Sequence, residues 1–251
     1  MNTKTYILTL AGHDPSAGAG LTSDIKTFEA HGLYGLSVCT AITVQNDVDF
    51  KHCVWMDTAV ILSQIDALFD RFEIHIVKIG LIPSWKTLGR ILEKLHRLNS
   101  NIKIVLDPIF KASAGFDFHT TKNQSPFDFI LKHCYIITPN YDEIQYLYPE
   151  KNIQDTLNHI SKTTNIYLKG GHRPHKKGWD ALYHSGIVMI NIPPNVSKVS
   201  EKHGSGCVLA SALASQLALG IPLEDACKHA KYYTEHFLNS NTSLLGTHYK
   251  L

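Results

Sequence analysis

Short apolar runs alternate with amphipathic stretches along most of the chain. Runs rich in β-branched residues predict strands at residues 5–11, 36–44, 74–79, 102–106, 135–138 and 165–168. Apolar residues at helical spacing predict helices at residues 21–30, 58–72, 84–98, 127–132, 141–148, 153–163 and 222–238. A further short strand is expected at 49–55, and a hairpin at 181–192 around Ser185-Gly186. This alternation predicts an α/β fold in three layers, in which helices cover both faces of a mostly parallel sheet.

A glycine-containing turn precedes the most uniformly apolar stretch of the chain. Residues 203–207 (HGSGC) lead into VLASALASQLALG, which is typical of a buried helix ending near Gly220. The first turn of a helix has unpaired backbone amides and a partial positive charge, so a glycine turn at that point is a candidate phosphate site. An ordinary loop before a Ser-capped core helix explains the same residues equally well. Residues elsewhere in the chain are needed to distinguish these two interpretations.

Polar residues and glycines recur directly after the predicted strands. They are Gly12 and Asp14 after the first strand, Gln45 and Asn46 after the second, Gly80 and Leu81 after the third, Asp107 after the fourth, Asn140 and Glu143 after the fifth, and Lys169 after the sixth. Residues 12–20 form a glycine-rich loop that matches neither a Walker A loop nor a dinucleotide fingerprint. A single Asp at such a position is more often a turn residue. Together they predict a ligand site at one edge of the sheet, because ligands of such folds bind there.

Composition narrows the class of protein. The 251 residues include 24 basic and 22 acidic side chains, and this near balance gives no reason to expect nucleic acid or a membrane surface as a partner. Five cysteines without a CxxC pair argue against a disulfide framework and a structural zinc site. The sequence shows no signal segment and no apolar stretch of membrane length. We therefore expect a cytoplasmic protein with a single domain over residues 1–251.

Six stretches in a fixed order carry a resemblance to a known family. They are AGHDPSAGAGLTSDIKTFEAHGLYGLSVCTAITVQN, VKIGLI, VLDPIFKASAG, ITPNYDEIQYL, LKGGH and HGSGC. With these stretches the chain resembles the hydroxymethylpyrimidine/phosphomethylpyrimidine kinases of thiamine biosynthesis, in the ribokinase-like superfamily. The resemblance implies ATP-dependent phosphorylation of 4-amino-5-hydroxymethyl-2-methylpyrimidine, followed by phosphorylation of the monophosphate to the diphosphate. It also implies a ribokinase-like fold, a requirement for Mg²⁺ and a homodimer.

The resemblance also implies roles for individual residues. The amides of Gly204, Ser205, Gly206 and Cys207 would hold the transferring phosphoryl group, and Lys169 would add positive charge beside the phosphates. Asp107 and Glu143 would supply oxygen ligands to Mg²⁺, and Asn140 and Glu143 match an NxxE element of the ATP site. Gly12, Asp24, Gln45, Leu81 and Ile109 would contact the pyrimidine. A solvent-exposed strand-end lysine and an Asn140–Glu143 capping box explain the same residue types without a ligand.

Cys207 stands where sugar kinases of this superfamily have an aspartate as general base. We expect the helix N-terminus to lower the pKa of this thiol, so that a thiolate accepts the proton of the substrate hydroxyl. The alternative is a buried cysteine that acts as a small apolar residue. Gln45 carries both donors and acceptors and can pair with an aminopyrimidine edge, which favours a heteroaromatic alcohol over a sugar.

Several positions depart from the family pattern. His13 stands where Thr or Ser is usual, Ala17 replaces a Gly, Leu81 a Met and Ser205 a Thr, and the final residues SLLGTHYKL lack a glycine-rich segment. These changes leave the phosphate turn intact but bear on substrate preference. Two other functions therefore stay open, a pyridoxal/pyridoxine kinase and a non-catalytic protein that binds a vitamer or a nucleotide.

Overall fold

The computed structural model describes residues 5–110, 127–171, 173 and 175–250. The strands are β1 (Tyr6–His13), β2 (Tyr34–Gln45), β3 (Phe50–Trp55), β4 (Ile76–Ile79), β5 (Lys103–Leu106), β6 (Ile136–Ile137), β7 (Asn165–Leu168), β8 (Asp180–His184) and β9 (Ile187–Ile192). The helices are α1 (Gly20–Ala30), α2 (Thr58–Phe69), α3 (Trp85–Leu98), α4 (Phe127–His133), α5 (Tyr141–Leu147), α6 (Ile153–Ser161), α7 (Ser205–Ala218) and α8 (Leu223–Leu238). The end of the stretch VLDPIFKASAG, which contains Ser113 and Gly115, lies outside the described residues.

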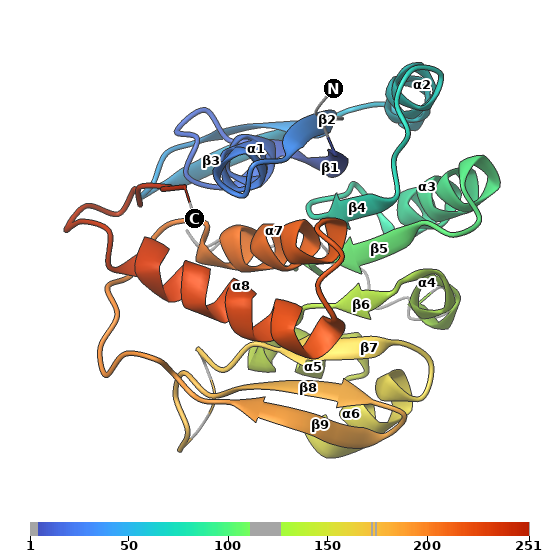
Figure 1. The fold of residues 1–251 in the computed structure, drawn as a ribbon. Coiled ribbons are helices and arrows are strands. Elements are labelled where there is room, and N and C mark those ends of the chain that lie inside the picture. The colour runs from blue at the N-terminus through green and yellow to red at the C-terminus, as the bar shows by residue number, and fades with distance from the viewer. Residues whose placement is uncertain (1–4, 111–126, 172, 174, 251) are drawn as a thin grey trace.

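The strands form one nine-stranded sheet in the order β3-β2-β1-β4-β5-β6-β7-β8-β9 (Figure 1). Pairing is parallel from β2 through β7, whereas β3, β8 and β9 pair antiparallel at the two sides. The chain order reverses between β1 and β4, which are neighbours in the sheet. In parallel sheets of this kind, the crevice for ligands opens at such a reversal, outside the carboxyl ends of the strands.

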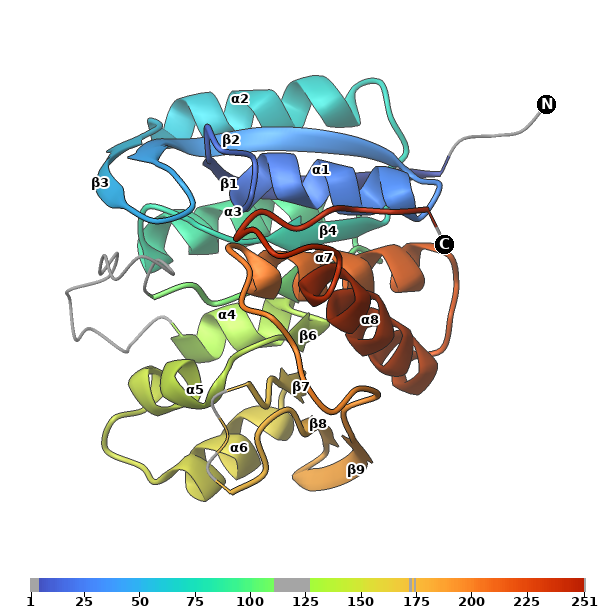
Figure 2. The same ribbon diagram turned by 90° about the vertical axis from the view of Figure 1, so that its left-hand side faces the viewer.

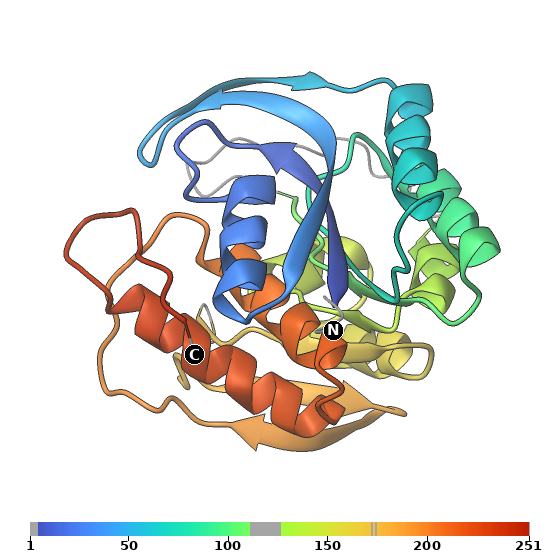
Figure 3. The same ribbon diagram turned by 45° about the horizontal axis from the view of Figure 1, so that its top comes forward.

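Helices cover both faces of the sheet, as the alternating pattern predicted (Figure 2, Figure 3). One apolar core joins the sheet to α2, α3, α4, α5 and α6, and a second core joins it to α1, α7 and α8. Strand β5 shows the division, because Ile104 and Leu106 belong to the first core and Val105 to the second. The expected three-layer α/β/α sandwich with a mostly parallel sheet is therefore confirmed. No helix in the described part of the chain has the length and apolar content to span a membrane.

Most predicted elements are present, and the differences lie at their ends. Helix α2 ends at Phe69 rather than at residue 72, and Pro222 precedes α8 as its N-cap. Strand β1 continues through Gly12, so this glycine belongs to the strand and not to the following loop. The most consequential difference is the start of α7 at Ser205, which places Ser205, Gly206 and Cys207 in the first helical turn.

Candidate active site

The glycine turn before α7 packs against the loop that follows β1. Gly204 is the N-cap of α7 and has a left-handed backbone with φ +77°. A Cβ built on Gly204 would lie only 2.1 Å from the carbonyl oxygen of Gly18, so no other residue fits here without movement of the loop. This close backbone approach fixes the first turn of α7 at the carboxyl edge of the sheet.

Gly206 opens this turn toward a cluster of charged side chains. A Cβ built on Gly206 would lie 3.5 Å from Nζ of Lys169 and 3.9 Å from Oδ2 of Asp107. The absence of a side chain at Gly206 therefore leaves backbone amides next to a lysine ammonium group. Amides at a helix N-terminus combined with a fixed positive charge are suited to bind an anion.

Lys169 forms ion pairs with two carboxylates, one directly after β5 and one in the first turn of α5. Its Nζ lies 2.9 Å from Oδ1 of Asp107 and 3.3 Å from Oε2 of Glu143. Oδ1 of Asp107 also accepts a hydrogen bond from the Thr138 hydroxyl at 3.1 Å. Burial lowers the pKa of Lys169, but the two carboxylates outweigh it and raise this pKa, so the ammonium stays charged.

A helix cap formed by Asn140 and Glu143 fixes the position of the Glu143 carboxylate. The Asn140 side chain accepts from the Glu143 amide at 2.8 Å, and the Glu143 side chain accepts from the Asn140 amide at 2.7 Å. This is the expected capping box at the start of α5. Burial and the nearby Asp107 raise the pKa of Glu143 more than Lys169 lowers it. The same residues thus cap a helix and present an oxygen of Glu143 to Lys169.

The expected lowering of the Cys207 pKa is wrong. Cys207 is buried, and burial raises the pKa of its thiol to about 11. Lys78 lowers this pKa, whereas Asp24 and Asp107 raise it, and the balance leaves desolvation as the dominant effect. The position of Cys207 at the start of a helix could be predicted from the sequence, but its loss of contact with water could not.

Asp24 lies beneath the site and is fully buried. Its carboxylate accepts from Lys78 at 2.9 and 3.0 Å, and from the hydroxyls of Thr9 at 2.6 Å and Ser211 at 2.7 Å. Both side chains of the Asp24–Lys78 pair are 0% exposed. The resemblance implied a contact between Asp24 and substrate, but in this structure both carboxylate oxygens are occupied by interior partners.

Lys78 is a residue that the sequence reasoning missed. The signal was available, because a lysine interrupts the apolar strand VKIGLI and a buried lysine requires a partner. A Cβ built on Gly80 would lie 2.9 Å from Nζ of Lys78 and 3.6 Å from the Ile109 side chain. The buried ion pair therefore forms the floor of the site.

The other residues expected to contact substrate gather near the ends of β1, β2, β4 and β5. A Cβ built on Gly12 would lie 3.0 Å from Cδ2 of Leu81. A Cβ built on Gly80, the residue before Leu81, would lie 3.6 Å from Cδ1 of Ile109. The side-chain amide of Gln45 donates to the Thr43 hydroxyl at 2.9 Å, which donates to the carbonyl oxygen of His13 at 2.8 Å. These bonds tie Gln45, at the end of β2, to the end of β1.

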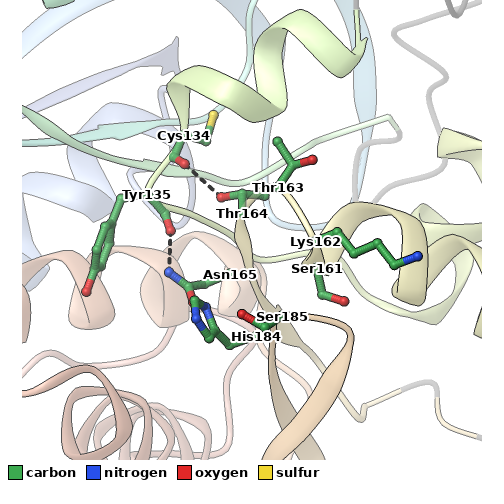
Figure 4. A pocket seen from close by; sticks show the side chains of 9 residues that line it. All are labelled: Cys134, Tyr135, Ser161, Lys162, Thr163, Thr164, Asn165, His184 and Ser185. Atoms are coloured by element: carbon green, nitrogen blue, oxygen red, sulfur yellow. Dashed lines mark hydrogen bonds between the residues drawn. The ribbon is translucent and has the colours of Figure 1, made fainter.

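A cavity of about 190 Å³ lies at the opposite edge of the sheet, near the start of β7 (Figure 4). Several of its polar groups are paired within the protein, because Thr164 donates to the carbonyl of Cys134 and Asn165 to that of Tyr135. The ring of His184 lies 2.7 Å from Oδ1 of Asn165. This cavity shares no residue with the cluster at the start of α7.

Comparison with known proteins shows which family the chain belongs to. The sequence pattern that defines the phosphomethylpyrimidine kinase family matches residues 14–251. The chain belongs to this family. A hydroxymethylpyrimidine/phosphomethylpyrimidine kinase from Rhizobium meliloti (strain 1021) is 31% identical over 234 residues, which cover 90% of this chain and 87% of that protein. A protein of the same name from Aquifex aeolicus (strain VF5) is 31% identical over 256 residues, covering 97% and 98%.

Solved structures show the same fold. The crystal structure of phosphomethylpyrimidine kinase from Clostridium difficile 630 matches with a TM-score of 0.75 at 31% identity, over 92% of this chain and 98% of that chain. The pyridoxal kinase from Staphylococcus aureus in complex with ADP matches with a TM-score of 0.82 at 22% identity, over 95% and 89%. At 22% identity the likeness shows the fold alone, and it confirms the expected ribokinase-like architecture.

Proposed function

We propose that this chain is an ATP-dependent kinase of thiamine biosynthesis that phosphorylates 4-amino-5-hydroxymethyl-2-methylpyrimidine and then its monophosphate. Membership of the phosphomethylpyrimidine kinase family supports the reaction class. The observation that carries the proposal is the juxtaposition of Gly206 with Lys169 and Asp107, within 3.5 and 3.9 Å of a Cβ position. That juxtaposition joins helix amides, a lysine and a carboxylate at the edge where a parallel sheet binds ligands.

The backbone and Lys169 supply most of what phosphoryl transfer requires. Catalysis of this reaction consists largely of positioning and of stabilising negative charge on the transferred group. The amides of Ser205, Gly206 and Cys207 point from the helix N-terminus and would hold the phosphoryl oxygens. Lys169 would contact the phosphates while keeping its positive charge, since its pKa is raised by Asp107 and Glu143 despite burial.

The residues present fit Mg²⁺. This ion binds oxygen ligands and is commonly held by one or two carboxylates together with substrate phosphates. The described hydrogen bonds to Asp107 fall on Oδ1, and its Oδ2 faces Gly206. Asp107 and Glu143 would therefore hold the ion, which when bound neutralises charge on the phosphates. A nearby cation favours the ionised form of Glu143, whose pKa is raised in the free protein.

Cys207 would accept the proton of the substrate hydroxyl in the first reaction. Because burial raises the pKa of this thiol to about 11, the neutral thiol predominates at pH 7, and the thiolate fraction increases as the pH rises. The first phosphorylation should therefore become faster as pH rises. The second acceptor is a phosphate oxygen that is already anionic, so that reaction needs no base.

Gln45, Gly12, Leu81 and Ile109 would bind the pyrimidine. The Gln45 side chain is held at the end of β2 through Thr43, which leaves its amide oxygen to accept from an exocyclic amino group. The Leu81 side chain lies against Gly12 and would give a bound ring an apolar contact. An aminopyrimidine satisfies both features, whereas a sugar would leave the apolar surface unused.

A coupled ADP-release assay tests the proposed function. The acceptors are the pyrimidine alcohol, its monophosphate, pyridoxal and ribose, each with ATP and Mg²⁺ in excess. We expect turnover of the first two acceptors at rates well above those of pyridoxal and ribose. A preference for pyridoxal of about tenfold or more in kcat/KM would assign the protein to pyridoxal phosphorylation instead. No ADP release with any acceptor would indicate a non-catalytic binding protein.

We also propose that two copies of the chain pair through the face formed by β2 and β3. Ile42 and Val54 are cross-strand neighbours, and together with Val44 they are 46, 50 and 38% exposed in that order. Exposed apolar side chains grouped in this way mark interaction surfaces, and a symmetric dimer buries such a patch against itself. Sedimentation velocity should give a dimer for the wild type and a monomer for Ile42→Lys, and a monomeric wild type would contradict the proposal.

A cytoplasmic location and a single kinase domain over residues 1–251 complete the proposal. The cysteines Cys39, Cys53, Cys134, Cys207 and Cys227 are all free. Free thiols in this number are typical of proteins that work in a reducing compartment. Fractionation of cells that produce the tagged chain tests the location, and limited proteolysis tests for an internal boundary.

A further inference from the structure

His203 and Asp14 form a buried pair that joins two loops 189 residues apart in the sequence. Nε2 of His203 lies 2.9 Å from Oδ2 of Asp14, and the side chains are 4% and 1% exposed. Nδ1 of His203 is buried and has no hydrogen-bond partner among the described residues. Asp14 is therefore the hydrogen-bonding anchor of this ring.

Asp14 also organises the loop in which it lies. Its carboxylate accepts from the Ser16 amide at 2.9 Å, from the Ser16 hydroxyl at 2.8 Å and from the Ala19 amide at 2.8 Å. Although burial raises the pKa of Asp14, the bonds from His203 and Ser16 outweigh it and lower this pKa to about 2. Because Asp14 is ionised at neutral pH, Nε2 of His203 carries the proton and donates it.

The two loops also touch through their backbones. The His203 ring packs on Gly18, because a Cβ built on Gly18 would lie 2.6 Å from Cδ2 of His203. The same Cβ would lie 2.7 Å from Cδ2 of Leu245. Gly204, the residue after His203, meets the Gly18 carbonyl oxygen as described above. The Gly20 amide donates to the thiol of Cys207. Residues 14–20 and 203–207 thus behave as one packed block.

We propose that His203 is a positioning residue, whose bond to Asp14 fixes the loop of residues 14–20 against the phosphate turn of residues 203–207. This inference rests on the proposed function, because residues 14–20 follow the strand end where the acceptor binds. The pair sets the distance between the acceptor hydroxyl and the phosphoryl group, and it touches neither. A misplacement of about 1 Å between reacting groups lowers a rate by about 100-fold.

Three variants and one matched control separate positioning from folding. His203→Phe keeps a buried ring and removes the donor, whereas His203→Gln restores an N–H donor at similar reach. Asp14→Asn weakens the acceptor. The control is His31→Phe at the far end of α1, because His31 is also buried. One of its ring nitrogens bonds to the Thr27 carbonyl oxygen at 2.7 Å, and the other has no hydrogen-bond partner in the described part of the chain.

The readouts are steady-state kinetics with the pyrimidine alcohol, thermal unfolding, and hydrogen exchange of the peptide that covers residues 14–20. For His203→Phe we expect kcat to fall by about 10- to 100-fold while KM for ATP changes by less than about threefold. His203→Gln should recover most of this loss, and hydrogen exchange at residues 14–20 should increase in His203→Phe but not in His31→Phe. Asp14→Asn should also lower kcat, and combining it with His203→Phe should add little further loss.

Two results would overturn the positioning role. One is a His203→Phe enzyme with the kcat of the wild type, and the other is an equal loss of activity in His31→Phe, which would indicate general destabilisation. Failure of the proposed function looks different, because the wild type itself would then not phosphorylate the pyrimidine alcohol. In that case hydrogen exchange at residues 14–20 still tests the loop connection without reference to substrate.

Discussion

The substitution Gly206→Ala should impair phosphate binding at the start of α7 without destabilising the fold. The backbone of Gly206 is helical, and a methyl group there would lie 3.5 Å from Nζ of Lys169 and 3.9 Å from Oδ2 of Asp107, which are ordinary contact distances. Alanine is favoured over glycine in helices by up to about 1 kcal/mol. We therefore expect the free energy of unfolding of this variant to be unchanged or slightly higher.

The same methyl group occupies the space that a phosphoryl oxygen needs between the α7 amides and Lys169. Loss of one donor to a transition-state oxyanion costs about 10²- to 10³-fold in kcat. We expect a loss of this size for Gly206→Ala in the ADP-release assay with the pyrimidine alcohol, together with an undiminished melting temperature.

Two other glycines serve as controls. Gly89→Ala, in α3, places its methyl group 3.7 Å from the Phe129 ring and should leave activity unchanged. Gly204→Ala forces a left-handed residue against the Gly18 carbonyl oxygen and should lower the melting temperature. If Gly206→Ala keeps the kcat and the KM for ATP of the wild type, the proposed place of the phosphoryl group is wrong.

Three further variants test the charges of the site and of the fold. Lys169→Met should raise KM for ATP and lower kcat/KM by about 100-fold, because it removes the cation beside the phosphates, and an unchanged kinetic profile would contradict that contact. Cys207→Ala should slow the first phosphorylation more than the second and abolish the rise of the first rate with pH that a thiol pKa of about 11 predicts, whereas equal losses in both reactions would exclude a general base. Burial, together with the charges of Lys26 and His31, lowers the pKa of His248 to about 4. Between about pH 6.5 and about pH 4 the unfolded chain therefore binds more protons at His248 than the folded chain does, and the free energy of unfolding falls as the pH decreases through this range. Urea unfolding at several pH values should show that the free energy of unfolding falls less steeply with decreasing pH in His248→Gln than in the wild type. An identical pH dependence in the two proteins would exclude His248 as the source of the loss.

The order of the elements could be predicted from the sequence because each strand and helix carries its own pattern. The capping box of Asn140 and Glu143 was equally readable, since both partners lie within one turn of α5. The start of α7 at Ser205 was not, because the left-handed Gly204 that sets it is held by Gly18 from a distant loop. Local patterns thus determine the elements, and distant contacts determine where some of them begin.

Contacts between residues far apart in the sequence explain the features of the site that could not be predicted from it. Lys78 and Asp24 are 54 residues apart, and only the adjacency of β1, β4, α1 and α7 brings them together. The resemblance to the kinase family implied a substrate contact for Asp24, and the sequence around Asp24 does not show that a buried lysine from a distant strand pairs with it. For Cys207 the helix N-terminus was visible in the sequence, but the burial that raises its pKa depends on the packing of the whole site.

A crystal structure of the protein with AMP-PCP, Mg²⁺ and the pyrimidine alcohol tests the central claim most directly. We predict that the terminal phosphate lies over the amides of Gly206 and Cys207 within reach of Lys169, with the substrate hydroxyl between that phosphate and the Cys207 thiol. A terminal phosphate bound away from the α7 N-terminus, or a pyrimidine ring outside the strand ends that carry Gly12 and Gln45, would contradict it.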